Sequence, residues 1–474
     1  MEKEVKRNSF YWKAVIMRIL KIIHFSGSVA LFVTCWMMFY HLSSSTDVQI
    51  RFSILMCGFY AVVLAFLFRV FHAYTVGLCR KVEIVYSLSL SELLAAGIIY
   101  VLSCLAWLRF VNPLPLLSLL PMQVLFNIIW TAIANRVFFA MNRAKKSVVI
   151  YRVEKDLRRI AEVKKHAKRF EIVKYIEASG GDIGNLLGQI GKPEAIFVVG
   201  VPSTVCNALT KYCVDNGIEG YFAPHIGDII MMGSKSIPQF HVPIVSVERK
   251  HIMPEYLFLK RFFDLILSAI GIVVLSPVLL ICALAVKIYD GGPVIYKQTR
   301  LTKDGKTFKL LKFRSMRTDA EKDGVARLSS GDKDDRITPV GRILRKVRLD
   351  ETPQLFNIFA GQMSIVGPRP ERPEIAKQYE ELTPAFSLRL QVKAGLTGYA
   401  QIYGKYNSQP YDKLEMDLLY INNMSFFEDL KLIFATVKIL FISESTEGVE
   451  SGQTTAMDSD NGTESKEKEP ETVK

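Results

Sequence analysis

The chain has 474 residues, of which 50% are hydrophobic, and it carries a formal net charge of +14. This length exceeds one ordinary domain, so we expect two or three folded units, part of them in a membrane and part in water. The positive charge suits an anionic lipid surface, whereas nucleic acid is not an expected partner, because the basic residues flank apolar segments without a zinc-finger or RNA-binding signature.

The seven cysteines and seven histidines follow no pattern of a disulfide framework or of a metal site. The cysteines lie mostly inside or beside apolar stretches and never form C-x-x-C, which is typical of small buried hydrophobic residues. The histidines form no H-x-x-x-H pair. Metal binding through imidazole is therefore not indicated.

Residues 1–146 are predicted to form a four-helix transmembrane bundle. Four apolar segments, each near the ~20 residues that span a bilayer, cover about residues 15–40, 52–71, 88–108 and 114–139. Lysine and arginine mark the N-terminus, the second connection and the exit, whereas the first and third connections are nearly free of them. By the positive-inside rule, both ends of the bundle face the cytoplasm.

Residues 147–250 are predicted to form a Rossmann-like α/β domain. "SVVIY" and "EAIFVVGV" are typical of strands, and "PSTVCNALTKYCVDNG" is typical of a helix that ends at a glycine. Such alternation predicts a parallel sheet. The first strand is followed by "RVEKD" and not by G-x-G-x-x-G, so the sequence favours a structural or regulatory module over a dinucleotide site.

A fifth apolar stretch, predicted as a membrane helix over residues 262–287, has Ser276 and Pro277 at its centre. Proline removes an intrahelical hydrogen bond and bends the helix, so one interpretation is a kinked spanning helix. Basic residues typical of the cytoplasmic side lie on both flanks: Lys260, Arg261, Lys287, Lys297 and Arg300. This charge pattern favours a re-entrant helix that enters and leaves on one membrane face.

Residues 251–442 are predicted to form a third, mainly helical region, followed at 443–474 by a polar tail that is expected to be disordered. Within it "KLLKFRSM", "DDRITPVGRILRKVRLDETPQLFNIF" and "GQMSIVGPRPERPE" combine guanidinium and ammonium groups with carboxylates. Arginine forks suit phosphate oxygens, and Mg²⁺ is usually held by one or two carboxylates plus substrate phosphates. The residue types fit a phosphorylated substrate with Mg²⁺ as well as they fit a solvated salt-bridge surface.

Asp350 and Glu351 are adjacent in the second of these clusters, just before a proline. An Asp at the N-cap, a Glu in the first turn and a Pro near the start are ordinary choices for beginning a helix. A helix N-terminus also presents free N–H groups and the positive end of the helix dipole, where a phosphate binds. The local sequence therefore allows a helix start, a reactive site, or both.

The chain resembles the monotopic phosphoglycosyl transferases, bacterial sugar transferases that move a phosphosugar from a nucleotide diphosphate sugar to a polyprenol phosphate. The resemblance covers about residues 256–441 and rests on "KRFFD", "LSPVLL", "GPVIYKQTR", "KFRSM", "DDRITPVGRILRKVRLDETPQLFNIFAGQMSIVGPRP" and "GLTGYAQI". The preceding bundle and α/β domain are similar to those of the larger members, which start exopolysaccharide or capsule assembly. The resemblance implies a multi-pass protein of the bacterial cytoplasmic membrane whose catalytic domain faces the cytoplasm.

The resemblance also implies a reaction, in which a sugar-1-phosphate passes from a UDP-sugar to undecaprenyl phosphate and UMP is released. The expected sugar is glucose or galactose, with an N-acetylated sugar as the alternative. Asp350 matches the family's nucleophile, which holds the phosphosugar as an acyl phosphate, and Glu351 matches the adjacent acid that helps hold Mg²⁺. Basic positions that are candidates for binding the substrate phosphates are matched by Lys312, Arg314, Arg336 and Arg369. Ser276 and Pro277 match the break of the family's re-entrant helix.

Two departures and two other hypotheses remain beside this resemblance. Gln362 stands where the family usually has Asp, and Ala394 where it usually has Pro, so loop geometry is expected to differ there. A glycosyltransferase that passes the sugar alone and releases UDP is the alternative enzyme, because Asp332 and Asp334 form a D-x-D. The third hypothesis is a non-catalytic membrane sensor or scaffold. The sequence leaves open the sugar, the role of the α/β domain, and the oligomeric state, a homo-oligomer included.

Overall fold

The structure, a computed structural model, describes residues 2–40, 47–160, 169–178, 183–237, 244–249, 252–317, 334, 336–404 and 409–440. The chain divides into two compact units, Met1–Ala223 and Pro224–Lys474, which we describe one after the other. The tail at 443–474, which the sequence predicts to be disordered, lies outside the described residues.

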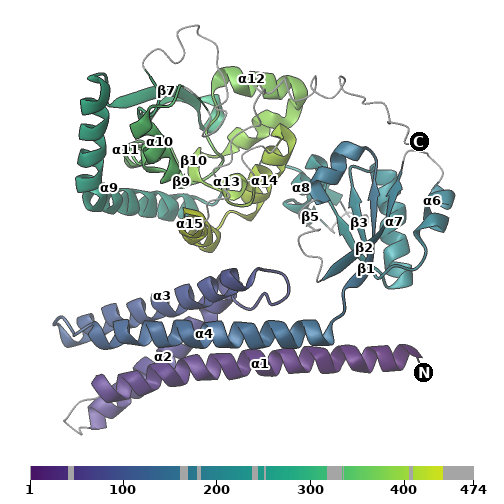
Figure 1. Cartoon of the computed structure of the whole chain (residues 1–474), viewed down its shortest axis with the longest axis horizontal. Coiled ribbons are helices and arrows are strands. Elements are labelled where there is room, and N and C mark those ends of the chain that lie inside the picture. Colours follow the sequence, from purple (N-terminus) through teal and green to yellow (C-terminus); the bar gives the residue numbers. More distant parts are fainter. Residues whose placement is uncertain are drawn as a thin grey trace, which may run out of the picture. The chain divides into compact units, whose positions relative to one another are not determined.

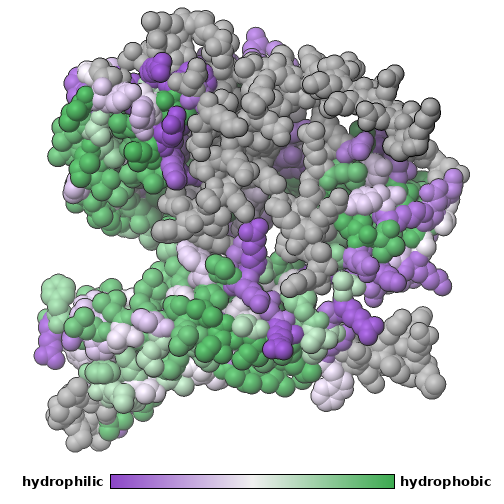
Figure 2. All heavy atoms as spheres, in the orientation of Figure 1, coloured by the Kyte–Doolittle hydropathy of each residue, from purple (hydrophilic) through white to green (hydrophobic). Residues whose placement is uncertain are grey.

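Four long helices begin the first unit and pack as a bundle (Figure 1): α1 (Glu2–Phe39), α2 (Asp47–Val70), α3 (Lys81–Trp107) and α4 (Leu114–Met141). α1 and α3 each contact both α2 and α4, so the helices close into a ring. Each of the four predicted apolar segments corresponds to one of these helices. All four, together with α9 (Pro254–Asp290) of the second unit, are long and apolar enough to cross a membrane. Figure 2 shows hydrophobic residues over the bundle surface, as befits a membrane protein.

Polar side chains meet inside the bundle, where most of the packing is apolar. A ring nitrogen of His24 in α1 lies 2.8 Å from Asn127 Oδ1 in α4, and the Asn127 amide donates to Glu92 Oε2 in α3 at 2.7 Å. All three side chains are fully buried. Because polar groups away from water need partners within the protein, this network favours one register of α1, α3 and α4.

A four-stranded parallel sheet follows, as the sequence predicted, with the strand order β2-β1-β3-β4. The strands are β1 (Lys145–Tyr151), β2 (Phe170–Glu177), β3 (Ala195–Val199) and β4 (Glu219–Phe222). On one face Leu186 of α6 (Ile183–Ile190) and Leu209 of α7 (Ser203–Asn216) pack on Ile150 of β1. The other face packs on Ile160, at the end of the 3-10 helix η1 (Glu154–Ile160). Gly217, at φ 64°, ends α7 at the predicted glycine.

The boundary between the units lies at Ala223, before residue 250, where the sequence predicted the α/β domain to end. α8 (Ile226–Met232) belongs to the second unit, where the fully buried Ile229 packs with Leu414 and Leu418 of α14 (Pro410–Asn423). The antiparallel pair β5 (Lys235–Ile237) and β6 (Ile244–Ser246) follows α8. The apolar side of α8 is therefore buried by residues far along the chain, which no local pattern could indicate.

The fifth apolar helix, α9, is bent into two arms (Figure 1). Pro277 lies inside this helix, and the Ser276 hydroxyl donates to the Val273 carbonyl at 2.7 Å. Proline lacks the amide hydrogen that would continue the helical ladder, which accounts for the bend. Hydrophobic side chains dominate its surface in Figure 2, and Val273 and Ile288 are 72% and 81% exposed.

Both arms of α9 pack on the second unit. In the first arm the Asp264 carboxylate accepts a hydrogen bond of 3.0 Å from the Ile365 amide. In the second arm Cys282 and Val286 are buried in a cluster with Phe313 and Leu344. α9 is therefore an integral part of this unit and not a separate anchor.

The rest of the second unit combines helices with two short ribbons. β7 (Ile295–Leu301) and β8 (Thr307–Phe313) form an antiparallel hairpin, and β9 (Ser364–Val366) and β10 (Gly395–Thr397) pair in parallel. The helices are α10 (Pro339–Lys346), α11 (Gln354–Phe359), α12 (Pro373–Leu382), α13 (Tyr399–Tyr403), α14 and α15 (Phe426–Leu440). The region is mainly helical, as predicted, whereas the two ribbons were not predicted.

Candidate active site

Asp350 and Glu351 lie in a 3-10 turn, η5 (Leu349–Glu351), between α10 and α11. The sequence allowed Asp350 to open a helix, but α11 begins only at Gln354, and no side chain in the described part of the chain caps it. Arg348, at φ 55°, turns the chain after α10, and Pro353, whose φ is already helical, precedes α11. Both carboxylates therefore belong to a tight turn.

The Glu351 carboxylate is held by two cations through one oxygen. Lys312 Nζ donates to Oε1 at 2.9 Å, and Arg369 Nη2 donates to the same atom at 2.8 Å. Burial alone would raise the pKa of the Glu351 carboxyl, but the charges of Arg369 and Lys312 outweigh it and place the pKa well below the usual 4.5. Glu351 is therefore a firmly ionised carboxylate.

The Asp350 carboxylate has a different environment although it is the next residue. Asp350 is 8% exposed, and no hydrogen bond to its carboxylate occurs among the described residues. Burial and the neighbouring Glu351 charge raise the pKa of Asp350, while the charges of Lys312, Arg345 and Arg369 lower it in part. Its oxygens are therefore available to a reaction partner, next to cations that attract phosphate.

Lys312 reaches the turn because β8 is tied to α11. The Asn357 side chain accepts a hydrogen bond from the Leu311 amide at 2.9 Å and donates one to the Lys309 carbonyl at 2.8 Å. Asn357 is 2% exposed, so these bonds replace water on both of its polar ends. The strand that carries Lys312 is thereby fixed beside the helix that follows Glu351.

Arg369 is presented by the loop between β9 and α12, which contains Pro368 and Pro370. The β9–β10 pair continues into this loop, where the Gly367 amide donates to the Thr397 carbonyl and the Gly395 amide to the Pro368 carbonyl, each at 2.8 Å. The "GPRP" and "GLTG" motifs are therefore one structural element.

Arg314 and Arg336, two of the predicted phosphate-binding residues, do not contact the two carboxylates through any described hydrogen bond or ion pair. The Arg314 guanidinium packs against Gly292, where an added Cβ would lie 2.1 Å from Nη1. Arg336 holds Asp334 with Nε and Nη2, at 2.8 and 2.7 Å. Asp334 is thus buried and paired with Arg336, which does not favour a role for it in a D-x-D metal site. Asp332, the other residue of that motif, lies outside the described residues.

The two departures from the family's usual residues have visible consequences. Gln362 Oε1 accepts a hydrogen bond of 2.6 Å from the side chain of Asn357, so it joins the β8–α11 connection. The Ala394 amide donates to Thr302 Oγ1 at 3.2 Å, which a proline at this position could not do. Neither residue touches Asp350 or Glu351 through a described hydrogen bond.

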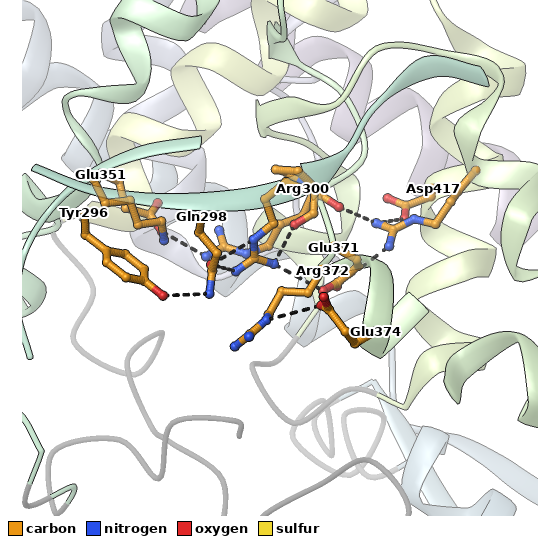
Figure 3. A network of polar contacts seen from close by, with 12 residues as sticks. Tyr296, Gln298, Arg300, Glu351, Glu371, Arg372, Glu374 and Asp417 are labelled. Carbon is orange, nitrogen blue, oxygen red and sulfur yellow. Dashed lines mark hydrogen bonds and ion pairs between the residues drawn. The ribbon is translucent and has the colours of Figure 1, made fainter. Parts of the chain in front are cut away.

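Sequence reasoning missed two arginines of the site. Arg345 lies in the last turn of α10, and its charge lowers the pKa of Asp350. Its Nη1 is buried without a hydrogen bond partner among the described residues. Arg300 of β7 donates from Nη1 to the Pro370 carbonyl at 2.9 Å and lies in the polar network of Figure 3. Both stand within the quoted motifs, but in runs rich in basic residues no local feature identifies the side chain that faces the turn.

The residues present fit a magnesium ion in kind and in number. Among the described residues no group of three or more His, Cys, Asp or Glu side chains could hold a metal ion. The carboxylates of Asp350 and Glu351 supply the one or two protein ligands that suffice for Mg²⁺ when substrate phosphates provide the rest. Lys312 and Arg369 both bond to Glu351 Oε1, so Oε2 is the oxygen that Glu351 offers.

A known protein family matches the part of the chain that contains this site. The family model described as bacterial sugar transferase matches residues 255–443. The "Exopolysaccharide production protein PSS" of Rhizobium leguminosarum bv. phaseoli is 41% identical over 201 residues, which cover 40% of this chain and 98% of that protein. The chain belongs to the bacterial sugar transferase family. The matched region lies within the second unit and contains Asp350 and Glu351.

Two larger relatives match over part of their length. The "UDP-glucose:undecaprenyl-phosphate glucose-1-phosphate transferase" of Klebsiella pneumoniae is 42% identical over 242 residues, 50% of this chain and 52% of that protein. The "UDP-N-acetylgalactosamine-undecaprenyl-phosphate N-acetylgalactosaminephosphotransferase" of Aeromonas hydrophila is 37% identical over 190 residues, 40% of this chain and 44% of that protein. The chain therefore spans about half the length of these relatives.

Proposed function

We propose that this chain is a phosphoglycosyl transferase that moves a sugar-1-phosphate from a UDP-sugar to undecaprenyl phosphate and releases UMP. The observation that carries the proposal is the contrast between two adjacent carboxylates. Glu351 is bonded to Lys312 and Arg369, whereas Asp350 accepts no hydrogen bond among the described residues. A nucleophile for a phosphate ester needs such a free oxygen, together with cations that draw the anionic substrate to it.

The proposed chemistry has two steps with balanced bonds. In the first, an Asp350 carboxylate oxygen attacks the sugar-linked phosphorus, and the bond from that phosphorus to the bridging oxygen breaks, so that UMP leaves with this oxygen. In the second, a phosphate oxygen of undecaprenyl phosphate attacks the same phosphorus, and the Asp350 carboxylate is released. Lys312 and Arg369 balance the negative charge of the phosphoryl oxygens in both steps.

We also propose Mg²⁺ as the cofactor. When bound, it would neutralise charge on the phosphoryl oxygens, with Glu351 as its main protein ligand. Lys312 and Arg369 keep the Glu351 carboxylate ionised and oriented before any ion arrives, because they hold its other oxygen. The protein thus supplies a ready anionic ligand beside the nucleophile.

The packing of α9 supports the proposal that this helix is re-entrant. A straight helix of its 37 residues would be about 55 Å long, against a hydrocarbon core of about 30 Å. Both arms contact the same unit, through Asp264 in one and Cys282 in the other, so a straight crossing would separate contacts that belong together. We propose that the second unit lies on the cytoplasmic face of a bacterial cell membrane and receives the lipid substrate there.

The sugar and the pathway follow from relatives and are part of the proposal. The Klebsiella relative is named for UDP-glucose and the Aeromonas relative for UDP-N-acetylgalactosamine, so relatives of similar identity differ in the sugar. We propose UDP-glucose or UDP-galactose, and a role in the first step of exopolysaccharide or capsule synthesis, for which the Rhizobium relative is named.

The test is an assay of membranes that contain the chain, with undecaprenyl phosphate and a panel of UDP-sugars. We expect UMP as the nucleotide product, and Asp350→Asn should lower turnover by a factor on the order of 10⁴ or more. Because Asp350 is buried beside the like charge of Glu351, the neutral Asn should leave thermal stability unchanged or raise it. Glu374→Gln, at a 63% exposed side chain, is the matched control and should keep wild-type activity.

The alternatives give different outcomes in the same assay. UDP as the only product would establish transfer of the sugar alone and refute the proposal. Turnover that survives Asp350→Asn would remove Asp350 as the nucleophile. Absence of any turnover in the wild-type chain with every sugar would favour a membrane sensor or scaffold.

A further inference from the structure

The side chain of Arg369 is 43% exposed, so packing does not hold it on Glu351. Its backbone is held instead, because three successive carbonyl oxygens of the loop accept hydrogen bonds. The Pro368 carbonyl accepts from the Gly395 amide at 2.8 Å, and the Arg369 carbonyl accepts from Arg389 Nη2 at 2.8 Å. The Pro370 carbonyl accepts from Arg300 Nη1 at 2.9 Å.

Two of these donors are long side chains, which are steady only if something holds them. Arg389, with 3% of its side chain exposed, pairs with Asp417 Oδ2 at 2.7 Å. Arg300 and Arg389 each lie 3.7 Å from a different oxygen of Glu371 (Figure 3). The carboxylates of Asp417 and Glu371 therefore hold the two guanidinium groups, which in turn hold the loop.

The charges of this network exist at neutral pH. Burial raises the pKa of Asp417 to about 6, with Arg389 opposing the rise and Glu371 adding to it. Burial also acts to raise the pKa of Glu371, but Lys413, Arg389 and Arg300 outweigh it, so that the pKa lies below the usual 4.5. Above pH 6 both carboxylates are thus ionised beside their arginines.

Stability alone does not explain why buried ion pairs stand here. Asp417 is 1% exposed, and taking such a charge from water costs free energy that its partner only partly returns. Apolar residues of similar volume would often give equal stability. Apolar residues, however, could not donate hydrogen bonds to the carbonyl oxygens of Arg369 and Pro370, as the two arginines do.

We propose that Asp417 and Glu371 are positioning residues of the phosphoglycosyl transferase reaction, acting through Arg389 and Arg300 to keep Arg369 on Glu351. This inference rests on the proposed function. Neither carboxylate touches the substrate. Each acts by restricting the movement of the loop that carries Arg369. A shift of the loop by about 1 Å is enough to cost a hundredfold in rate.

The test is a double-mutant cycle of Asp417→Asn with Arg369→Ala, read as kcat/KM for UMP release. In the wild-type background Asp417→Asn should lower kcat/KM about tenfold to a hundredfold. In the Arg369→Ala background the same change should cost less than about twofold, because the residue through which Asp417 acts is gone. Equal losses in both backgrounds would overturn the proposal and leave Asp417 a merely structural residue.

A second measurement does not depend on activity. Amide hydrogen exchange of residues 366–372 should be faster in Asp417→Asn than in wild type, while exchange in the bundle stays unchanged. Unchanged exchange in this loop would also overturn the proposal. Should the wild-type chain release no UMP, the proposed function fails, yet the exchange experiment still tests whether Asp417 holds the loop.

Two further variants keep the test decisive. The Arg389 fork meets Asp417 and the Arg369 carbonyl with Nη2 and lies near Glu371 with Nη1. Arg389→Lys keeps the charge but has a single nitrogen on a shorter side chain, so it should behave like Asp417→Asn and replaces it if that variant does not fold. Glu374→Gln changes the exposed rim of the same network, where Glu374 pairs with Arg372 at 3.7 Å, and should leave both kcat/KM and loop exchange at wild-type values. A wild-type kcat/KM in a folded Arg389→Lys variant would contradict the proposal.

Discussion

At the scale of single residues, the candidate site depends on two neighbours whose pKa values move in opposite directions. Burial acts on Asp350 and Glu351 alike, so it does not separate them. The difference lies in the neighbouring charges: at Glu351 the charges of Arg369 and Lys312, together with their hydrogen bonds, outweigh burial. At Asp350 the charge of Glu351 adds to the effect of burial, and the cations oppose it only in part. Environments that push adjacent pKa values apart are a usual way to give two carboxylates distinct chemical roles.

This difference predicts opposite shifts of the acidic limb of the pH–rate profile in two variants. Lys312→Met removes a charge that lowers the pKa of Asp350, so the limb should move to higher pH; Glu351→Gln removes a charge that raises it, so the limb should move to lower pH. In the wild type the loss of activity should begin above the usual Asp value of 3.8, because the pKa of Asp350 is raised. The measurement is residual kcat/KM for UMP release across pH.

Shifts of the two limbs in the same direction would contradict Asp350 as the ionised nucleophile. Asp334→Asn is the control, since Asp334 is a buried carboxylate paired with Arg336 and is not among the groups that shift the Asp350 pKa. Its acidic limb should coincide with that of the wild type.

At the scale of elements, two of the shortest strands place the arginine of the site. β9 and β10 have three residues each, and their backbones approach so closely that a Cβ on Gly395 would lie 2.0 Å from the Gly367 nitrogen. Only glycine allows this approach. It lets the Gly367 amide donate to the Thr397 carbonyl and the Gly395 amide donate to the Pro368 carbonyl. The position of Arg369 therefore depends on a glycine far along the chain.

Gly395→Ala should accordingly destabilise the second unit and reduce turnover. The added methyl group meets backbone that cannot rotate away, for which overpacking costs of roughly 1–3 kcal/mol are typical. Thermal unfolding and UMP release of the purified chain check both effects. Gly227→Ala is the matched control, because no atom lies within 4 Å of the Cβ it would add, and it should match the wild type in both assays.

At the scale of the whole molecule, the chain combines a bundle long enough to cross a membrane with a second unit that contains a bent apolar helix. The five helices all meet the length and hydropathy of a span, so composition does not separate α9 from the other four. What distinguishes α9 is that both of its arms pack on the other elements of the second unit. The bend at a proline makes that packing feasible.

A re-entrant α9 predicts that both of its ends are accessible from the cytoplasm. Glu255→Cys and Tyr289→Cys, in a background whose seven native cysteines are replaced by serine, should react with a membrane-impermeant maleimide in inverted vesicles and not in right-side-out vesicles. Ser44→Cys, in the first connection of the predicted bundle, should show the opposite pattern. Labelling of the two α9 ends from opposite sides would establish a spanning helix instead.

Much of the fold follows from local patterns. The apolar segments became α1 to α4 and α9, the strand-like stretches became β1 and β3, and the glycine at 217 ends α7. These features depend on periodicity and on backbone preferences, which a short stretch of sequence contains. The end of the α/β domain did not follow, because the apolar side of α8 is buried by α14 and not by its neighbours.

By itself the sequence determined which functional groups and which apolar segments the chain contains. These are two adjacent carboxylates, a set of arginines and lysines with the family's motifs, and five apolar helices. The tertiary structure alone decided how these groups pair. It joined Lys312 and Arg369 to Glu351, left Asp350 without a described hydrogen bond, and turned Arg336 towards Asp334. The physical reason is that a charge acts over a few ångströms, and only the packing of distant segments sets those distances.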